Sequence, residues 1–369
     1  MGETVSIRKT PLHAAHAEAG ARFVDFHGWE MPVQYEGILD ETRRVRAHGG
    51  LFDLCHMGRL VLTGPDREAL VERVFSGNFS KLKHGRAKYG FLLNENGYPI
   101  DDVLVYRDHE VVHIVINATG READTAWVNE QCAAGGFDAK VENVSDSQAM
   151  IALQGPASEH VLQPVCSADL SAVRYYGFAN ALVCGHEALL ARTGYTGEDG
   201  FELFFAEEHA REVWDALMDS GSALEVKPIG LGSRDLLRLE AGMPLYGQEI
   251  NLEIDPLEAG LGFGVDFTKD DTLGVPALRA RKEAGLKRTA VSLAQTGGRV
   301  ARTGHKVMRD GQEIGVVTSG GVSPTVERNI ARAIVDASAA EIGSTLDIEI
   351  RGRTHPMEVV AHPFYKRPR

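Results

Sequence analysis

The sequence predicts an α+β fold, in which strands and helices do not alternate regularly along the chain. Runs of alternating apolar and polar residues recur throughout, and helical segments fall between only some of them. A doubly wound parallel sheet would instead need a regular succession of one strand and one helix. The strand-like runs lie at residues 59–63, 102–107, 111–117, 149–154, 201–205, 289–294, 314–319 and 346–350.

Four segments have the pattern of helices. They lie at residues 65–76, 119–134, 207–220 and 233–240, and the second begins with a Thr-x-x-Glu sequence that predicts a capping box at Thr119. The composition changes near Asp266, where a Gly-rich apolar stretch is followed by one rich in Lys and Arg. We expect a domain boundary there, with a small β-sandwich or barrel after it.

The charge balance excludes one class of partner. With 39 Lys plus Arg against 52 Asp plus Glu, the formal net charge is -13, which repels a phosphate backbone, so no nucleic acid is expected to bind. No apolar run approaches the roughly 18 residues of a membrane-spanning helix, and none follows the charged N-terminal residues. We therefore expect no membrane association and a cytoplasmic location.

Several familiar kinds of site have no motif here. The glycine-rich pieces lack the strand and helix context of a dinucleotide site, and neither a phosphate-binding P-loop nor a G-x-S-x-G motif is present. The spacing closest to a metal pattern is that of His13 and His16, but no carboxylate partner follows in sequence. We expect both histidines to be solvated, and we expect no metal site.

Two adjacent carboxylates, Asp101 and Asp102, open a strand that follows an Asn-Gly hairpin turn. Neighbouring strand residues face opposite sides, so Asp101 shares a face with Val103, and Asp102 shares the other face with Leu104. At most one of the two therefore points into a given pocket, and the pattern does not say which. Exposure to solvent is the alternative for both, because isolated aspartates are mostly exposed.

Two further segments carry polar groups suited to a heterocyclic ligand. Asn117 ends a strand with an apolar face, and its amide offers a paired donor and acceptor; exposure to solvent is the alternative. Residues 194–202 combine three glycines, Tyr195 and three acids, and a turn explains the glycines but not the acids. Glu202 lies opposite an apolar strand face, where a carboxylate can accept two parallel N–H bonds from a pterin or guanine edge.

Residues 230–247 are predicted to form a loop, a short helix and a stop. Arg234 and Arg238 are four residues apart and so fall on one face of this helix. Considered alone, the segment is explained better by Asp–Arg pairs at the helix surface.

Taken together, these segments resemble the aminomethyltransferase family, the T proteins of the glycine cleavage system, almost from end to end. Cys55 stands where the family more often has Ser. Further family-like segments are Thr10–His13, Phe26–Tyr35, Leu51–Gly58, Leu153–Pro156 and Thr318–Thr325.

The resemblance implies three domains in a cloverleaf-like arrangement around a central folate channel. They are a discontinuous Greek-key domain at residues 1–50 and 145–265, an inserted ferredoxin-like domain at 51–144, and a C-terminal β-barrel or jelly-roll domain at 266–369. It also implies that Asp101, the first of the two aspartates, is the catalytic carboxylate. The implied folate contacts are Glu202 and Arg234, and the implied pocket walls are Asn117, Met57, Tyr89 and Tyr195.

The implied reaction moves the methylene carbon of an aminomethyl group from the lipoyl arm of the H protein to tetrahydrofolate. Its products are 5,10-methylenetetrahydrofolate, ammonia and the dihydrolipoyl carrier. Asp101 is expected to stabilise the iminium-like cation and to orient the folate nitrogens. Two alternatives stay open: a folate-dependent demethylase of the same fold, and a non-catalytic folate-binding protein.

Overall fold

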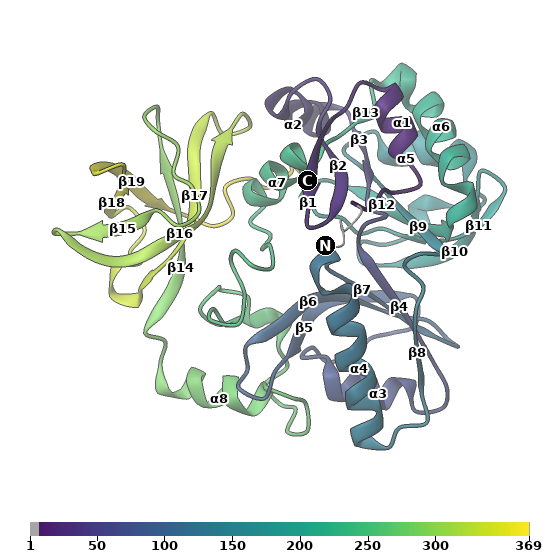
Figure 1. Cartoon of the computed structure of the whole chain (residues 1–369), viewed down its shortest axis with the longest axis horizontal. Coiled ribbons are helices and arrows are strands. Elements are labelled where there is room, and N and C mark those ends of the chain that lie inside the picture. The colour runs from purple at the N-terminus through teal and green to yellow at the C-terminus, as the bar shows by residue number, and fades with distance from the viewer. Residues whose placement is uncertain (1–6, 369) are drawn as a thin grey trace, which may run out of the picture.

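The computed structural model describes residues 7–368, which form three lobes around a central region that contains helix α7 (Figure 1). Each lobe is built on its own sheet: one of six strands, one of five strands, and one closed six-stranded barrel. A two-stranded ribbon, β1 (Arg22–Phe26) with β2 (Trp29–Gln34), lies near the centre. The predicted α+β class is confirmed.

The six-stranded sheet has the order β10-β11-β12-β9-β3-β13. Its strands are β3 (Gly50–Asp53), β9 (Gln148–Gln154), β10 (Phe178–Val183), β11 (His186–Ala191), β12 (Gly200–Ala206) and β13 (Lys227–Pro228). Helices α1 (His13–Glu18), α5 (Ser158–Leu162) and α6 (Ala210–Gly221) pack on its outer face. Phe201, Leu203 and Phe205 of β12 point into this core, as their alternation predicts, which leaves Glu202 on the inner face.

The five-stranded sheet has the order β5-β6-β7-β4-β8. Its strands are β4 (Gly58–Thr63), β5 (Arg86–Leu93), β6 (Pro99–Arg107), β7 (Val112–Ile116) and β8 (Lys140–Asn143). Helices α3 (Arg67–Val74) and α4 (Arg121–Gly135) pack on one face. Without the edge strand β5, the order β8-β4-β7-β6 and the helices after β4 and β7 form the ferredoxin-like arrangement.

The inner faces of these two sheets meet in a shared apolar core. Tyr106 of β6 packs edge-on against Phe204 of β12, with ring centroids 5.7 Å apart, and Met150 and Phe52 belong to the same cluster. Since strand side chains alternate, the face of β6 that carries Asp102, Leu104 and Tyr106 points toward the six-stranded sheet. The face with Val103 and Val105 instead packs under α3 and α4.

The C-terminal strands form a closed barrel in the order β14-β17-β16-β15-β18-β19, as expected for a C-terminal β-domain. The strands are β14 (Arg288–Gln295), β15 (Lys306–Arg309), β16 (Gln312–Ser323), β17 (Arg328–Asp336), β18 (Thr345–Ile350) and β19 (Arg353–Val360). The remaining helices are α2 (Ile38–Ala47), α7 (Leu231–Glu240) and α8 (Val275–Ala284). Within the described residues, no helix is both long and apolar enough to cross a membrane.

Strand pairing suggests where the inserted lobe begins and ends. β3 pairs with β9 in the six-stranded sheet, so the excursion into the five-stranded sheet starts after Asp53. α8 packs through Val275 and Leu278 against Phe91 and Leu93 of β5, rather than within the barrel core. We propose that the inserted lobe runs from residue 54 to about residue 146, and that the barrel domain starts at β14.

One local prediction is wrong. Thr119 does not form a capping box, because no side chain caps α4; the helix instead follows a single 3-10 turn at Ala118–Gly120. That turn takes the place of the extended N-cap that a capping box needs.

α7 ties the barrel to the rest of the molecule through a buried ion pair. The Arg238 guanidinium, with a side chain that is 1% exposed, donates to Glu249 Oε2 at 2.6 Å and to Ser319 Oγ of β16 at 2.8 Å. Glu249 in turn accepts from Thr318 Oγ1 at 2.7 Å. Through these contacts Arg238 connects α7 to the segment that follows it and to the barrel.

Replacing Arg238 with Met should lower the free energy of unfolding by about 3–5 kcal/mol, because it leaves the Glu249 carboxylate buried without its cation. Urea unfolding followed by circular dichroism measures the change. Arg43→Met is the matched control, since Arg43 is 58% exposed and, among residues 7–368, pairs only with Asp40; it should change stability by less than about 0.5 kcal/mol. Equal midpoints for the two variants would contradict the role given to Arg238.

Candidate active site

A cavity of about 1080 Å³ lies between the three lobes. Its walls come from the inner faces of both large sheets, from α7 with the segment that follows it, and from the barrel. This size suits a ligand larger than a single heterocycle. Residues that represent the walls are Tyr89, Leu104, Glu202, Arg234, Met243, Tyr246 and Ser319.

Six of the seven residues that the sequence singles out line this cavity. They are Met57, Tyr89, Asn117, Tyr195, Glu202 and Arg234. Segments far apart in sequence are therefore brought together around one space. Asp101 is the exception, and its neighbour Asp102 lines the cavity in its place.

Strand alternation explains why Asp102, rather than Asp101, lines the cavity. Asp101 points away from the cavity and is 1% exposed, and its two oxygens accept from the backbone N–H and from Nδ2 of Asn117, both at 2.7 Å. Asp102 shares the cavity face with Leu104 and accepts from the Tyr89 hydroxyl at 2.9 Å and from Asn117 Nδ2 at 2.9 Å. The placement of Asp101 at the cavity therefore needs correction, and Asp102 is the carboxylate that a ligand can touch.

Burial sets the ionisation of Asp102. Loss of water, together with the nearby charge of Asp101, raises the pKa of Asp102 to about 7, while the hydrogen bonds from Tyr89 and Asn117 oppose the rise. A carboxylate whose pKa lies near neutrality is suited to accept a proton in a reaction.

The loop before β12 is shaped by Gln154 of β9. Its amide donates to the Thr193 carbonyl at 3.0 Å and accepts from Thr196 Oγ1 at 3.0 Å. Gly194 lies so close that a Cβ there would be 1.9 Å from the Gln154 side chain, so only glycine fits. The acids of the loop have different roles: Glu198 binds Arg46 at 2.8 Å, and Asp199 binds Arg192, whereas Glu202 reaches the cavity.

Glu202 is held by one of its two oxygens. Oε2 accepts from Thr193 Oγ1 and, at 3.5 Å, from the Tyr106 hydroxyl. Within residues 7–368, Oε1 has no hydrogen-bond partner, so it is available to a ligand. Burial raises the pKa of the Glu202 carboxyl above its usual value, whereas the hydrogen bond from Thr193 and the charge of Arg234 act in the opposite direction.

Arg234 supplies the positive charge at the cavity. Its guanidinium lies over the Tyr195 ring, 4.6 Å from the centroid, and the Tyr195 hydroxyl donates to the Pro244 carbonyl. Within the described part of the chain, the Arg234 side chain forms no ion pair or hydrogen bond, in contrast to Arg238 one turn later. The sequence indicated a shared helix face, but not that one arginine would face the cavity and the other the barrel.

Other cavity residues carried no distinct signal in the sequence. His56 is 2% exposed at the cavity wall, and burial lowers its pKa to about 3, so its ring is neutral near pH 7. Tyr106 and Tyr176 looked like ordinary apolar strand or loop residues. His362, which follows the last barrel strand, closes the wall next to Gly242.

The histidine prediction is wrong for His16. Its side chain is 1% exposed and binds Asp53 Oδ2 at 2.8 Å and the Tyr35 hydroxyl at 2.9 Å, because α1 packs over the six-stranded sheet. His13 is partly buried and bound to Glu30 at 2.8 Å. Both histidines have carboxylate partners that lie far from them in sequence.

A different group of side chains brings possible metal-ligand atoms within 4.8 Å of one another on the six-stranded lobe. These are His186, His209 and Glu212. The two imidazole rings stack almost in parallel, 3.7 Å apart and tilted by 14°. Ring nitrogens bind a metal in the plane of the ring, and two parallel planes do not meet at one ion, so we assign no metal to this group.

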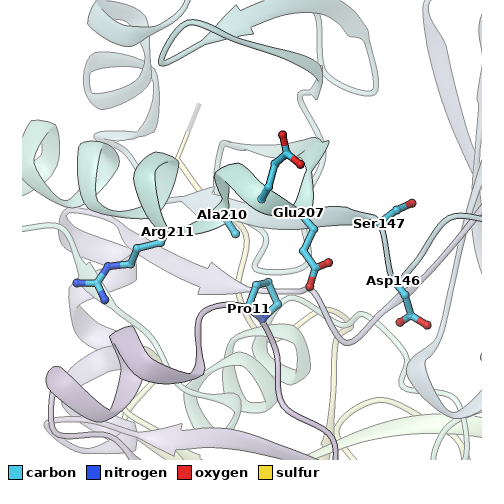
Figure 2. A pocket seen from close by; sticks show the side chains of 7 residues that line it. Pro11, Asp146, Ser147, Glu207, Ala210 and Arg211 are labelled. Atoms are coloured by element: carbon cyan, nitrogen blue, oxygen red, sulfur yellow. The ribbon is translucent and has the colours of Figure 1, made fainter.

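A second hollow, of about 500 Å³, lies on the surface next to α6 (Figure 2). Two of its charged side chains already have partners: Arg211 binds Glu18 at 2.7 Å and Asp215 at 2.6 Å, and Asp146 binds Arg121 at 2.6 Å. The central cavity, where Glu202 Oε1 and the Arg234 guanidinium have no hydrogen-bond partner within residues 7–368, is therefore the candidate active site.

The raised pKa of Asp102 predicts how stability changes with pH. Between its unfolded pKa of roughly 4 and its folded pKa of about 7, the unfolded chain has lost this proton while the folded chain keeps it, so the contribution of Asp102 to stability falls as pH rises. The free energy of unfolding of Asp102→Asn, taken relative to that of wild type, should therefore rise by on the order of 2 kcal/mol from about pH 5 to about pH 8. Chemical denaturation at both pH values measures this gain. Exposed Asp271→Asn is the control, and a gain that is no larger at high pH would contradict the assignment.

Comparison with known proteins agrees with this arrangement. Residues 12–269 match the GCVT N-terminal domain family, and residues 288–366 match the glycine cleavage T-protein C-terminal barrel domain family. The chain is 43% identical to an aminomethyltransferase of Desulfitobacterium hafniense over 98% of this chain and 99% of that protein. It is 44% identical to the aminomethyltransferase of Lysinibacillus sphaericus over 99% of each.

A solved structure is similar along the whole chain. The glycine cleavage system aminomethyltransferase T of Bartonella henselae superposes with a TM-score of 0.91 at 31% identity, over 98% of this chain and 99% of that one. The chain therefore belongs to the aminomethyltransferase family of glycine cleavage T proteins.

Proposed function

We propose that in this aminomethyltransferase the central cavity binds tetrahydrofolate and receives the aminomethyl group carried on the lipoyl arm of an H protein. The reaction gives 5,10-methylenetetrahydrofolate, ammonia and the dihydrolipoyl carrier. The observation that carries the proposal is the pair of acceptors that line the cavity from two sheets: Asp102 of β6, and Glu202 of β12, whose Oε1 has no hydrogen-bond partner within residues 7–368.

The spacing of these two groups suits a ligand with a ring edge at one end and a reactive amine farther along. Tyr106, which hydrogen-bonds Glu202, lies four residues from Asp102 on the same face of β6, or about 13 Å by the usual rise of a strand. Glu202 accepts N–H groups from the guanidine-like edge of the pterin, and Arg234 and Tyr195 border the same space. Asp102 then faces the amines that take up the carbon.

The chemistry requires a negative charge at that place. Departure of sulfur from the aminomethyl carbon leaves an iminium cation, and departure of ammonia leaves a sulfur-stabilised one; an adjacent carboxylate stabilises either. The attacking amine must also lose a proton, and Asp102, whose pKa lies near neutrality, is suited to accept it. Water would hydrolyse the cation, so the apolar walls from Leu104, Met57 and Met243 protect it.

The assignment of Asp102 can be tested against that of Asp101 with two variants of the same chemistry. Purified protein supplied with aminomethylated H protein and tetrahydrofolate should release ammonia and methylenetetrahydrofolate in equal amounts. Asp102→Asn should lower turnover by about 10²–10⁴-fold, whereas Asp101→Asn should keep it within about tenfold of wild type.

The opposite order of the two variants would return the catalytic role to Asp101. Binding of tetrahydrofolate without release of ammonia would favour the demethylase or the non-catalytic folate-binding protein.

Glu202→Gln should weaken tetrahydrofolate binding by roughly 10–100-fold, because a charge-assisted acceptor is lost from the ring edge. Isothermal titration calorimetry measures the affinity. Glu207→Gln is the matched control, since Glu207 lies at the surface hollow of Figure 2. Unchanged affinity in Glu202→Gln would remove Glu202 from the folate site.

A further inference from the structure

Two histidines of the described residues are almost completely buried, and they differ in their partners. His16 is 1% exposed, and its ring nitrogens bind Asp53 Oδ2 at 2.8 Å and the Tyr35 hydroxyl at 2.9 Å. His56 is 2% exposed, yet neither of its ring nitrogens forms a hydrogen bond within residues 7–368. A buried polar group without a partner is costly, so at a cavity wall we expect it to serve a ligand.

His56 lies where the chain crosses from one large sheet to the other. It belongs to a turn between β3 of the six-stranded sheet and β4 of the five-stranded sheet, and it lines the central cavity. Glu202 and Asp102 line the same cavity, one from each of the two sheets that this turn connects. His56 is therefore on the segment that joins the two walls carrying these carboxylates.

The turn and the ring are held in place by contacts on several sides. The Met57 backbone N–H donates to the Leu54 carbonyl at 3.0 Å, and the buried Arg59 guanidinium donates to the Met57 carbonyl at 2.9 Å. The Phe26 ring packs edge-on against the imidazole of His56, with centroids 5.7 Å apart and planes at 89°. The imidazole is thus fixed before a ligand arrives, which reduces the ordering cost of binding.

The surroundings of the ring predict which nitrogen of His56 carries the proton. Nδ1 is buried without a partner, whereas Nε2 is not enclosed in this way. A neutral imidazole has one N–H donor and one acceptor nitrogen, and an orphaned buried donor is rarer in folded proteins than an under-satisfied acceptor. The proton is therefore expected on Nε2, from which a ligand in the cavity can accept a hydrogen bond.

The charged groups around His56 favour the neutral ring. Burial lowers the pKa of His56 to about 3; the charge of Asp53 opposes this shift, and those of Arg234, Arg59 and Arg121 add to it. A neutral imidazole still donates through its N–H. It does so without placing a further positive charge beside a carbon that becomes cationic during the reaction.

We propose that His56 donates a hydrogen bond through Nε2 to the carbonyl oxygen of the pterin ring of tetrahydrofolate. In a pterin this oxygen lies between the guanidine-like edge and the nearer of the two amines that take up the carbon. With Glu202 at the edge and Asp102 facing the amines, the turn that joins their two sheets is the segment suited to supply this donor. The inference names a further contact of the proposed folate site and rests on that proposed function.

Other nitrogen donors at the cavity are less suited to this oxygen. Asn117 Nδ2 already donates to Asp101 Oδ1 at 2.7 Å and to Asp102 Oδ1 at 2.9 Å. The Arg234 guanidinium lies close enough to Glu202 for its charge to lower the pKa of that carboxyl, against the effect of burial. Arg234 is therefore better placed to balance Glu202 than to bind a neutral carbonyl.

Nuclear magnetic resonance of protein labelled with ¹⁵N in its histidines tests the contact directly. The signal that is missing from His56→Gln identifies His56 in wild type. Near pH 7 and without ligand, this signal should be that of a neutral ring protonated on Nε2, and saturating tetrahydrofolate should move the Nε2–H proton signal downfield. A charged ring, a ring protonated on Nδ1, or a signal that saturating tetrahydrofolate leaves unchanged would overturn the proposal.

Isothermal titration calorimetry separates the donor from the shape of the side chain. His56→Phe keeps a planar ring but leaves the pterin carbonyl without a donor, so tetrahydrofolate should bind roughly 10–100-fold more weakly. His56→Gln places an amide N–H near the position of Nε2 and should keep the affinity within about threefold of wild type. His160→Phe is the matched control, since His160 is exposed on α5, and it should bind as wild type does.

Equal weakening in His56→Phe and His56→Gln, or wild-type affinity in His56→Phe, would contradict the donor role. Circular dichroism establishes that each variant is folded, and the wild-type resonance shift does not depend on the folding of His56→Phe. Wild-type affinity in His56→Phe together with weakened binding in Glu202→Gln would remove this inference alone. Failure of the wild-type protein to bind tetrahydrofolate would remove the proposed function as well.

Discussion

The buried Arg238–Glu249 pair is the interaction on which the central cavity depends. One short helix, α7, presents Arg234 to the cavity and Arg238, one turn later, to the barrel. A guanidinium removed from water needs several acceptors in fixed places, and these come from Glu249, Ser319 and Asp235. The same contacts therefore fix the barrel and close one wall of the cavity.

A second constraint is the alternation of side chains along β6. One face of the strand packs under α4 and the other faces the six-stranded sheet, so adjacent aspartates have different environments. Asp102 lines the cavity, whereas Asp101 is 1% exposed and is bound by Asn117. A pair of carboxylates that look equivalent in sequence thus divides into one that can contact a ligand and one that can only influence its neighbour.

Local pattern was sufficient for much of the fold. Every predicted strand-like run overlaps an observed strand, and the alternation around Glu202 correctly placed it opposite Phe201 and Leu203. α2 was missed because its apolar residues are few and it is buried mainly through Glu41, Thr42 and Val45. Short edge strands such as β8 and β13 depend on their partners and carry little pattern of their own.

The site was less predictable, because it depends on which face of each element meets another lobe. Alternation could show that Asp101 and Asp102 point in opposite directions, but only the packing of α4 decides which of them is covered. The burial of His16 against Asp53 and that of Arg238 against Glu249 arise in the same way, from partners that are distant in sequence or in another lobe. Polar residues on amphipathic helices are usually exposed to solvent, but here tertiary contacts bury them.

A crystal structure of the protein with tetrahydrofolate would test the assignment of the cavity most directly. We expect the pterin edge to bind Glu202 Oε1 and the reactive amines to lie within hydrogen-bonding reach of Asp102, with Asp101 still bound to Asn117. Folate bound outside the central cavity, or against Asp101 after a rearrangement of β6, would contradict it.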